Sequence, residues 1–137
     1  MQFNGIHGIN IAVKDLDQWT RRYEEIFGIE AKPVDESGFA FPGLRGSNFD
    51  IGGFQLNLIT SVDEGTSVSR FLERRGEGVF LVSVAVQDVD VATRELRENG
   101  LAPLLDEPVR GEGHGAVNFT HPRDMAGVQL EFIEVPR

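Results

Sequence analysis

Two stretches of the chain, residues 6–13 and 80–86, alternate between large apolar side chains and small or polar ones. A period of two is typical of a β-strand with one buried face. After each stretch comes an aspartate and then apolar residues at helical spacing, up to Gly28 and Gly100. This pattern predicts helices over residues 16–27 and 90–99, and further apolar runs predict a short helix over 66–75 and strands over 54–60 and 128–135.

The two halves of the chain are related in sequence. Residues 7–25 align with residues 80–98 at an offset of 73 without a gap, and GFQLNLIT (53–60) aligns with GVQLEFIE (127–134) at an offset of 74. Two separate matches at nearly one offset indicate an internal duplication. The helix-opening aspartates, Asp15 and Asp88, coincide in the first match, and Asn57 falls opposite Glu131 in the second.

Each half therefore predicts a module of one strand, one helix and three strands. Weaker strand patterns complete the modules at residues 31–35, 38–41 and 45–50 in the first half, and near 104–110 and 116–120 in the second. The expected architecture is α+β, with tandem βαβββ modules forming one curled mixed sheet around a central cleft. We expect a single domain, 1–137, made of modules at about 5–60 and 79–135 joined by a helical linker, 61–78.

The two faces of the predicted sheet differ in chemistry. The large apolar faces of the first strands should pack beneath the helices, because an amphipathic helix buries its apolar stripe against such a surface. That face carries Ile9, Ile11 and Val13 in one module and Phe80, Val82, Val84 and Val86 in the other. The opposite face carries small or polar side chains and is expected to line the cleft: Gly8, Asn10, Gln55, Asn57, Leu81, Ser83, Gln129 and Glu131.

Composition narrows the range of partners. The 137 residues include 13 basic and 22 acidic side chains, for a net charge of −9, which disfavours nucleic acid and anionic membrane surfaces. No stretch approaches the roughly 20 apolar residues of a membrane span, and MQFNGIHGIN lacks a signal-peptide pattern. Zero cysteines exclude disulfides and thiolate metal sites. We expect a cytoplasmic protein with a small-molecule partner, and neither nucleic acid nor membrane.

Several strings in the chain resemble a known family. The duplicated module and INIAVKDLDQW resemble the vicinal oxygen chelate superfamily of glyoxalases, ring-cleaving dioxygenases, epimerases and bleomycin-resistance proteins. FLERRGEGVFLVSVAVQDVD and GEGHGAVNFTHPRDMAGVQLEF are similar to the middle and closing segments of methylmalonyl-CoA epimerases. The resemblance covers nearly the whole chain except residues 30–50, and it implies the cleft-bearing fold predicted above.

The resemblance also implies a divalent metal site, which this sequence does not match. Members that do chemistry hold the ion with a histidine on each module's first strand and a carboxylate or amide on each last strand. The histidine positions, seven residues before Asp15 and Asp88, fall on Gly8 and Leu81, while the others fall on Asn57 and Glu131. Asn57 and Glu131 would supply only two oxygen ligands. This is fewer than a divalent ion needs, since catalytic Zn²⁺ has about three protein ligands and Mg²⁺ about six oxygens. No cofactor is therefore expected.

His7, one position before Gly8, is the alternative metal ligand. A shift of one residue places a strand side chain on the opposite face, so we expect His7, like its repeat partner Phe80, to point away from the cleft. A β-bulge over residues 5–8 would turn it inward and leave a residual metal site of His7, Asn57 and Glu131.

Glu131 is the candidate catalytic residue, because a buried carboxylate can remove a proton from a carbon next to a carbonyl. The alternative is a former ligand now bonded to neighbouring amides. His114 lies on a glycine-rich loop that could cover a ligand. The candidate substrate-binding residues are Asn10, Gln55, Asn57, Leu81, Ser83, Phe41, Phe49, His114, Asn118 and Gln129, with Phe39 and Phe119 as further aromatic lining.

Two functions remain open at this point. One is a metal-free module that binds a small organic molecule, either to sequester it or to act on it without a metal. The other is a lyase or isomerase of the glyoxalase and epimerase type, with Glu131 as base and Asn57, Gln55 or Ser83 holding the oxyanion. Members of the superfamily usually build their cleft between two chains, so the resemblance implies a homodimer.

Overall fold

The computed structural model describes residues 1–111 and 114–135. One seven-stranded mixed sheet runs through both halves in the order β2-β3-β4-β1-β5-β7-β6. The first module contains β1 (Phe3–Ala12), α1 (Leu16–Phe27), β2 (Lys32–Val34), β3 (Leu44–Ile51) and β4 (Phe54–Ser61). The second contains β5 (Gly78–Val86), α3 (Val89–Glu98), β6 (Val117–Phe119) and β7 (Gln129–Ile133), and α2 (Ser67–Arg75) connects the two. The predicted α+β class and curled mixed sheet are confirmed.

The weak strand patterns were predicted less well. Residues 38–41 form no strand, because the segment contains the short 3₁₀ helix Glu36–Gly38 and then bends. In the second module, residues 104–110 contribute one isolated bridge between Val109 and Val117 in place of a strand. The first segment begins with Gly38 and the second contains Pro108, and residues of these two types interrupt a strand.

Helix ends follow the capping residues in the sequence. Asp15 accepts a hydrogen bond from the backbone N–H of Gln18 at the start of α1, and Gly28 ends the helix in a left-handed conformation with φ 68°. Asp88 begins α3 in the same way, and Thr66 begins α2. No described helix has the length and apolar character needed to cross a membrane.

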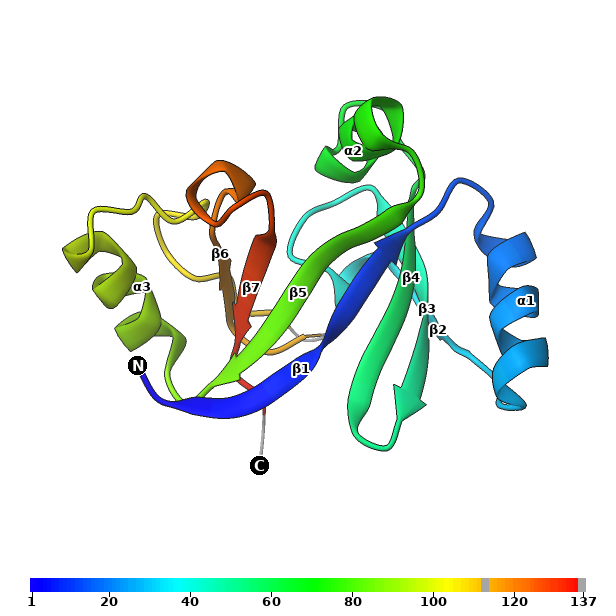
Figure 1. Cartoon of the computed structure of the whole chain (residues 1–137), viewed down its shortest axis with the longest axis horizontal. Coiled ribbons are helices and arrows are strands. Elements are labelled where there is room, and N and C mark those ends of the chain that lie inside the picture. The colour runs from blue at the N-terminus through cyan, green and yellow to red at the C-terminus, as the bar shows by residue number, and fades with distance from the viewer. Residues whose placement is uncertain (112–113, 136–137) are drawn as a thin grey trace.

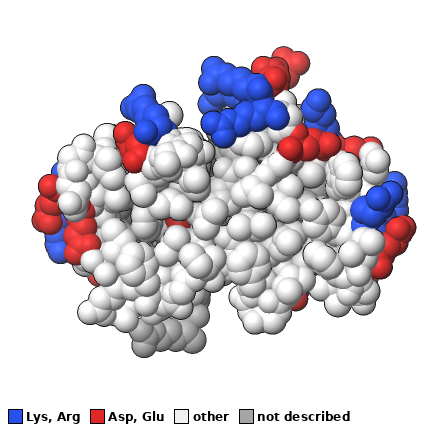
Figure 2. Space-filling model, viewed as in Figure 1, with Lys and Arg blue, Asp and Glu red and all other residues white. Residues whose placement is uncertain are grey.

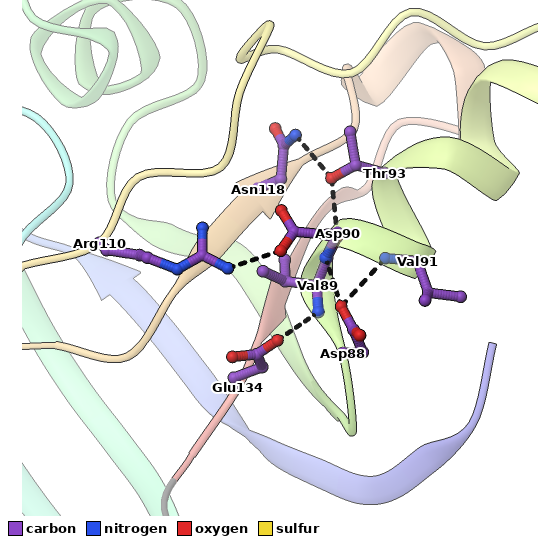
Figure 3. A network of polar contacts seen from close by, with 8 residues as sticks. All are labelled: Asp88, Val89, Asp90, Val91, Thr93, Arg110, Asn118 and Glu134. Carbon is purple, nitrogen blue, oxygen red and sulfur yellow. Dashed lines mark hydrogen bonds and ion pairs between the residues drawn. The ribbon is translucent and has the colours of Figure 1, made fainter.

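A threonine of the helix makes a polar contact with β3 in the first module and with β6 in the second. In the first module, the Thr20 and Ser47 hydroxyls lie 2.7 Å apart. In the second, the Asn118 amide donates to the Thr93 hydroxyl at 3.1 Å, within the network around α3 shown in Figure 3. Thr20 and Thr93 coincide in the internal repeat, so the duplication extends to the contacts that hold the helices in place.

The two modules meet where β1 and β5 pair antiparallel in the middle of the sheet. Helices α1 and α3 lie at opposite ends of the molecule and α2 lies above the central strands (Figure 1). Apolar clusters fill the space under each helix: Val13, Leu16, Phe49 and Leu58 with α1, Ala12, Ile59 and Val68 with α2, and Val86, Val89, Leu96 and Phe132 with α3. The opposite, concave face of the sheet remains for the cleft.

The β1–β5 ladder contains three register shifts, two of which are β-bulges at equivalent positions of the repeat. In β1, Ile6 pairs with Val84 and Gly8 with Ser83, which leaves His7 as the extra residue. In β5, the pairs Asn10–Leu81 and Ile11–Val79 leave Phe80 as the extra residue. An extra residue reverses the alternation locally, and both side chains line the cleft. The expectation that His7 points away from the cleft was therefore wrong, and the alternative of a bulge that turns it inward is confirmed. Phe80 lines the cavity and also packs against Phe71 of α2, so the expectation for it holds in part.

Only glycine fits at position 8 in this arrangement of strands. A Cβ added there would lie 1.8 Å from the backbone oxygen of Gln55 on the adjacent strand. We expect Gly8→Ala to lower the free energy of unfolding by about 1–3 kcal/mol, because the strand must shift to admit a methyl group. Urea unfolding followed by circular dichroism measures this, with Asn4→Ala at an exposed position of β1 as control. Equal stability of the two variants would contradict the close approach.

Candidate functional site in the cleft between the modules

The curled sheet encloses a cavity of about 270 Å³ that both modules line. Its floor is the concave face of β4, β1, β5 and β7, and its sides come from the segment after β2 and from the loop around His114. Most of the predicted substrate-binding residues line it: Asn10, Asn57, Leu81, Ser83, Phe41, His114 and Gln129, together with Glu131. The assignment of the small and polar face to the cleft was largely correct.

On the first module, the cavity wall is a row of side-chain amides. Asn48, Asn57 and Asn10 are neighbours across β3, β4 and β1. The Asn48 amide nitrogen donates to the Asn57 oxygen at 2.8 Å, and the Asn57 nitrogen donates to the Asn10 oxygen at 3.0 Å. Asn48 was missed by the sequence analysis, because it lies in the segment where the repeat could not be aligned.

On the second module, the wall carries a carboxyl group. Ser83 donates its hydroxyl to Glu131 Oε1 at 2.7 Å across the β5–β7 pair. Burial raises the pKa of Glu131 above its ordinary value, against smaller lowering effects of the Ser83 hydrogen bond and of the His114 charge. The second oxygen, Oε2, accepts no hydrogen bond from the described residues.

The two walls occupy equivalent positions of the repeat. Asn10 corresponds to Ser83 at the offset of 73, and Asn57 corresponds to Glu131 at the offset of 74. The Asn57–Asn10 and Ser83–Glu131 hydrogen bonds are therefore counterparts. Duplication thus placed an uncharged amide pair opposite a hydroxyl–carboxyl pair across one cavity.

Two imidazoles complete the polar lining. His7 enters through the bulge in β1, and burial lowers its pKa, which favours the neutral ring. His114 lies on the loop before β6 with its Nδ1 atom 2.6 Å from the backbone oxygen of Gly115. Glu131, His7 and His114 are the titratable groups among the described residues that line the cavity.

Aromatic rings form the apolar part of the wall. Phe41 and Phe119 lie 5.5 Å apart between ring centroids, Phe80 packs edge-on against Phe71 of α2 at 5.3 Å, and Phe39 lies beside them. A ligand in the cavity would therefore meet amides on one side, the carboxyl on the other and aromatic rings around its apolar part.

Three predicted binding residues lie elsewhere. Phe49 is buried beneath α1 against Leu58, because its neighbour Asn48 takes the cleft side of β3. Asn118 is fully buried and donates to Thr93 and to the backbone oxygen of Leu105 (Figure 3). Gln55 is on the cleft side of β4 but outside the cavity, where its oxygen accepts from Asn48 at 2.9 Å. Adjacent strand residues face opposite sides, so a register error of one residue explains the first two.

Comparison with known proteins agrees with this architecture. The sequence pattern of the Glyoxalase/Bleomycin resistance protein/Dioxygenase superfamily matches residues 5–132. The chain belongs to this superfamily. Human mitochondrial methylmalonyl-CoA epimerase is 25% identical over 130 residues, covering 92% of this chain and 71% of the relative.

Solved structures of superfamily members give the same result. A methylmalonyl-CoA epimerase variant from Streptomyces coelicolor, in complex with 2-nitronate-propionyl-CoA, is 30% identical with a TM-score of 0.85, over 99% of this chain and 100% of that one. The enzyme from Mycobacterium tuberculosis is 28% identical with a TM-score of 0.83, over 98% and 90%. Epimerases are thus among the similar members of the superfamily.

The residues at the superfamily's metal positions do not fit a divalent ion. Gly8 has no room for a side chain, and Leu81 is buried against Val117 and Phe119. Asn57 already uses its oxygen to accept from Asn48. Among residues 1–111 and 114–135, no three His, Asp or Glu side chains come together as a metal-binding group, and His7 with Glu131 makes only two.

The raised pKa of Glu131 predicts a pH-dependent cost to stability. The pKa of Glu131 in the folded protein exceeds its ordinary value of 4.5. The loss of stability caused by ionising this carboxyl is therefore absent below pH 4.5 and complete above the raised pKa. Glu131→Gln should therefore raise Tm at pH 8 by at least about 2 °C, and the difference should vanish toward pH 4. Differential scanning calorimetry across this range, with exposed Glu107→Gln as control, measures it. A gain that grew on acidification would contradict the burial of the carboxyl.

Proposed function

We propose that this protein catalyses proton transfer at a carbon next to a carbonyl, as an epimerase-type isomerase in which Glu131 is the base. The observation that supports this is a partly buried carboxyl on the cavity wall, with one oxygen held by Ser83 and the other without a hydrogen bond from the described residues. Glu131 Oε2 would take the proton, so that the C–H bond breaks, an O–H bond forms and the electron pair moves to the carbonyl oxygen. The raised pKa favours this exchange near neutral pH.

Return of the proton to the opposite face of the carbon would invert its configuration. The two imidazoles that line the cavity, His7 and His114, are the candidates for this second group. We propose that the reaction proceeds without a resident metal, since the donors at the superfamily's metal positions do not match such an ion. The enolate would then depend on hydrogen-bond donors from this chain.

The proposed substrate is an acyl thioester. Relatives of this chain include an epimerase solved in complex with methylmalonyl-CoA. A cavity of about 270 Å³ accommodates a short acyl group but not the whole of such a molecule, so the nucleotide part would lie outside the cleft. The zero cysteine content is compatible with a cytoplasmic location, which we propose as well.

Exchange of the proton at C2 of methylmalonyl-CoA in D₂O, followed by NMR, tests the function. We expect Glu131→Gln to slow the enzyme-catalysed exchange by at least about 100-fold, because an amide cannot remove the proton. Glu107→Gln, on the surface, should leave the rate unchanged. Unchanged exchange in Glu131→Gln would exclude Glu131 as the base.

A second candidate is a binding protein without turnover, favoured by the aromatic wall of Phe41, Phe80 and Phe119 around the cavity. The same experiment separates the two. Tight binding of the thioester by the unaltered protein, with no catalysed exchange, would assign the cleft to sequestration.

We also propose that two copies pair through the outer face of β1 and β5. The ladder places Ile6, Ile9 and Ile11 on this face beside Val79, Val82 and Val84, with Ile6 57% and Val79 54% exposed. Figure 2 shows charged side chains at the edges of this view and few over its middle, where Figure 1 draws β1 and β5. Because each chain has a net charge of −9, two copies repel each other least when they meet through a surface with few charged side chains.

Light scattering after gel filtration tests the pairing. The unaltered protein should have twice the chain mass of 15.2 kDa, and Ile6→Glu should be monomeric, because two carboxylates would be buried at the contact. Ile26→Glu on α1, a residue 73% exposed, should stay dimeric. A monomeric unaltered protein would contradict the proposal.

A further inference from the structure

The amides on the first module form a chain with a defined direction, which starts at the β3–β4 hairpin. Gln55 Nε2 donates to the backbone oxygen of Gly53 at 3.2 Å. Hydrogen bonds from the Gly53 N–H and from Gln55 also lower the pKa of Asp50, the cross-strand partner of Gln55. Both groups can only accept, so the nitrogen of Gln55 must point toward them and its oxygen toward Asn48.

This orientation passes from one side chain to the next. Asn48 must present its nitrogen to the Gln55 oxygen, and the same nitrogen donates to Asn57. Asn57 therefore accepts with its oxygen and turns its nitrogen to the Asn10 oxygen. Asn10, the last member, has its oxygen occupied and its nitrogen left over. Each amide that accepts a hydrogen bond becomes a better donor, so the chain strengthens its final N–H groups.

The free end of the chain lies on the cavity wall. Asn10 lines the cavity, and its nitrogen donates to no acceptor among the described residues. Asn10 pairs with Leu81 on β5. Two residues earlier in β1, Gly8 pairs with Ser83, which in turn pairs with Glu131 on β7. The Asn10 amide on the first module and the Glu131 carboxyl on the second thus line the same cavity.

The geometry points to the Asn10 carboxamide as the oxyanion donor of the cleft, a catalytic residue that binds the enolate oxygen of an acyl thioester after its C2 proton has left. This inference rests on the proposed proton transfer. Gln55, Asn57 and Ser83, the other candidate donors, each already donate a hydrogen bond to another group of the chain, whereas the Asn10 nitrogen donates none among the described residues. Asn48 and Asn57 are then positioning residues, which fix the orientation of the Asn10 amide without touching the reacting atoms.

The test compares two ligands that differ at the acyl group, 2-nitronate-propionyl-CoA, whose anionic oxygens imitate an enolate, and propionyl-CoA. Isothermal titration calorimetry gives both affinities without turnover. We expect Asn10→Ala to weaken nitronate binding by about tenfold or more and propionyl-CoA binding by less than about twofold, because the donor is needed where negative charge develops. Asn10→Asp, which keeps the shape but removes the donor, should also lose nitronate affinity selectively.

Equal losses of affinity for both ligands, or no loss of affinity for either, would overturn the role of Asn10. The same holds if the unaltered protein does not bind the nitronate more tightly than propionyl-CoA. Thermal unfolding of each variant shows whether the strand is intact, and Asn10→Ser provides a further variant that restores a neutral donor. Failure of the proposed function is distinguishable, because it would appear as unchanged proton exchange in Glu131→Gln, whereas the role of Asn10 is measured by binding alone.

Discussion

The antiparallel pairing of β1 with β5 is the constraint on which the rest of the structure depends. It joins the two modules into one sheet, sets their equivalent positions side by side and determines which side chains reach the concave face. Both bulges belong to this ladder, so His7 and Phe80 enter the cavity because of how the modules meet. A different register would exchange the polar and apolar faces along the whole seam.

The two modules illustrate how a duplicated scaffold acquires one asymmetric site. Their helices are held by equivalent threonines that contact β3 and β6, and their cleft-facing hydrogen bonds lie at equivalent positions. The scaffold therefore remains symmetric while the chemistry differs, with neutral amides on one side and a carboxyl on the other. In the reaction that we propose, a ligand between them meets the donor on one side and the base on the other.

Much of this could be predicted from the sequence, and the remainder has identifiable physical causes. The repeat, the capping aspartates and the alternation in the first strands predicted the fold class, the helix limits and the face that carries Asn10, Asn57 and Glu131. A bulge, however, is one extra residue in a ladder, and a period of two cannot show it, so His7 was assigned to the wrong face. Phe49 was assigned to the cleft and Asn48 was given no role, because β3 lies in the segment where the repeat could not be aligned.

The close approach at Gly8 also constrains how this chain can change over generations. Any side chain at that position would meet the backbone oxygen of Gln55 on the adjacent strand, so every substitution there costs stability unless the strand shifts. Removing the bulge alone would turn His7 out of the cavity and leave nothing in its place. The glycine at position 8 and the bulge at His7 are therefore linked, because a change at either one alone disturbs the strand or removes the imidazole from the cavity.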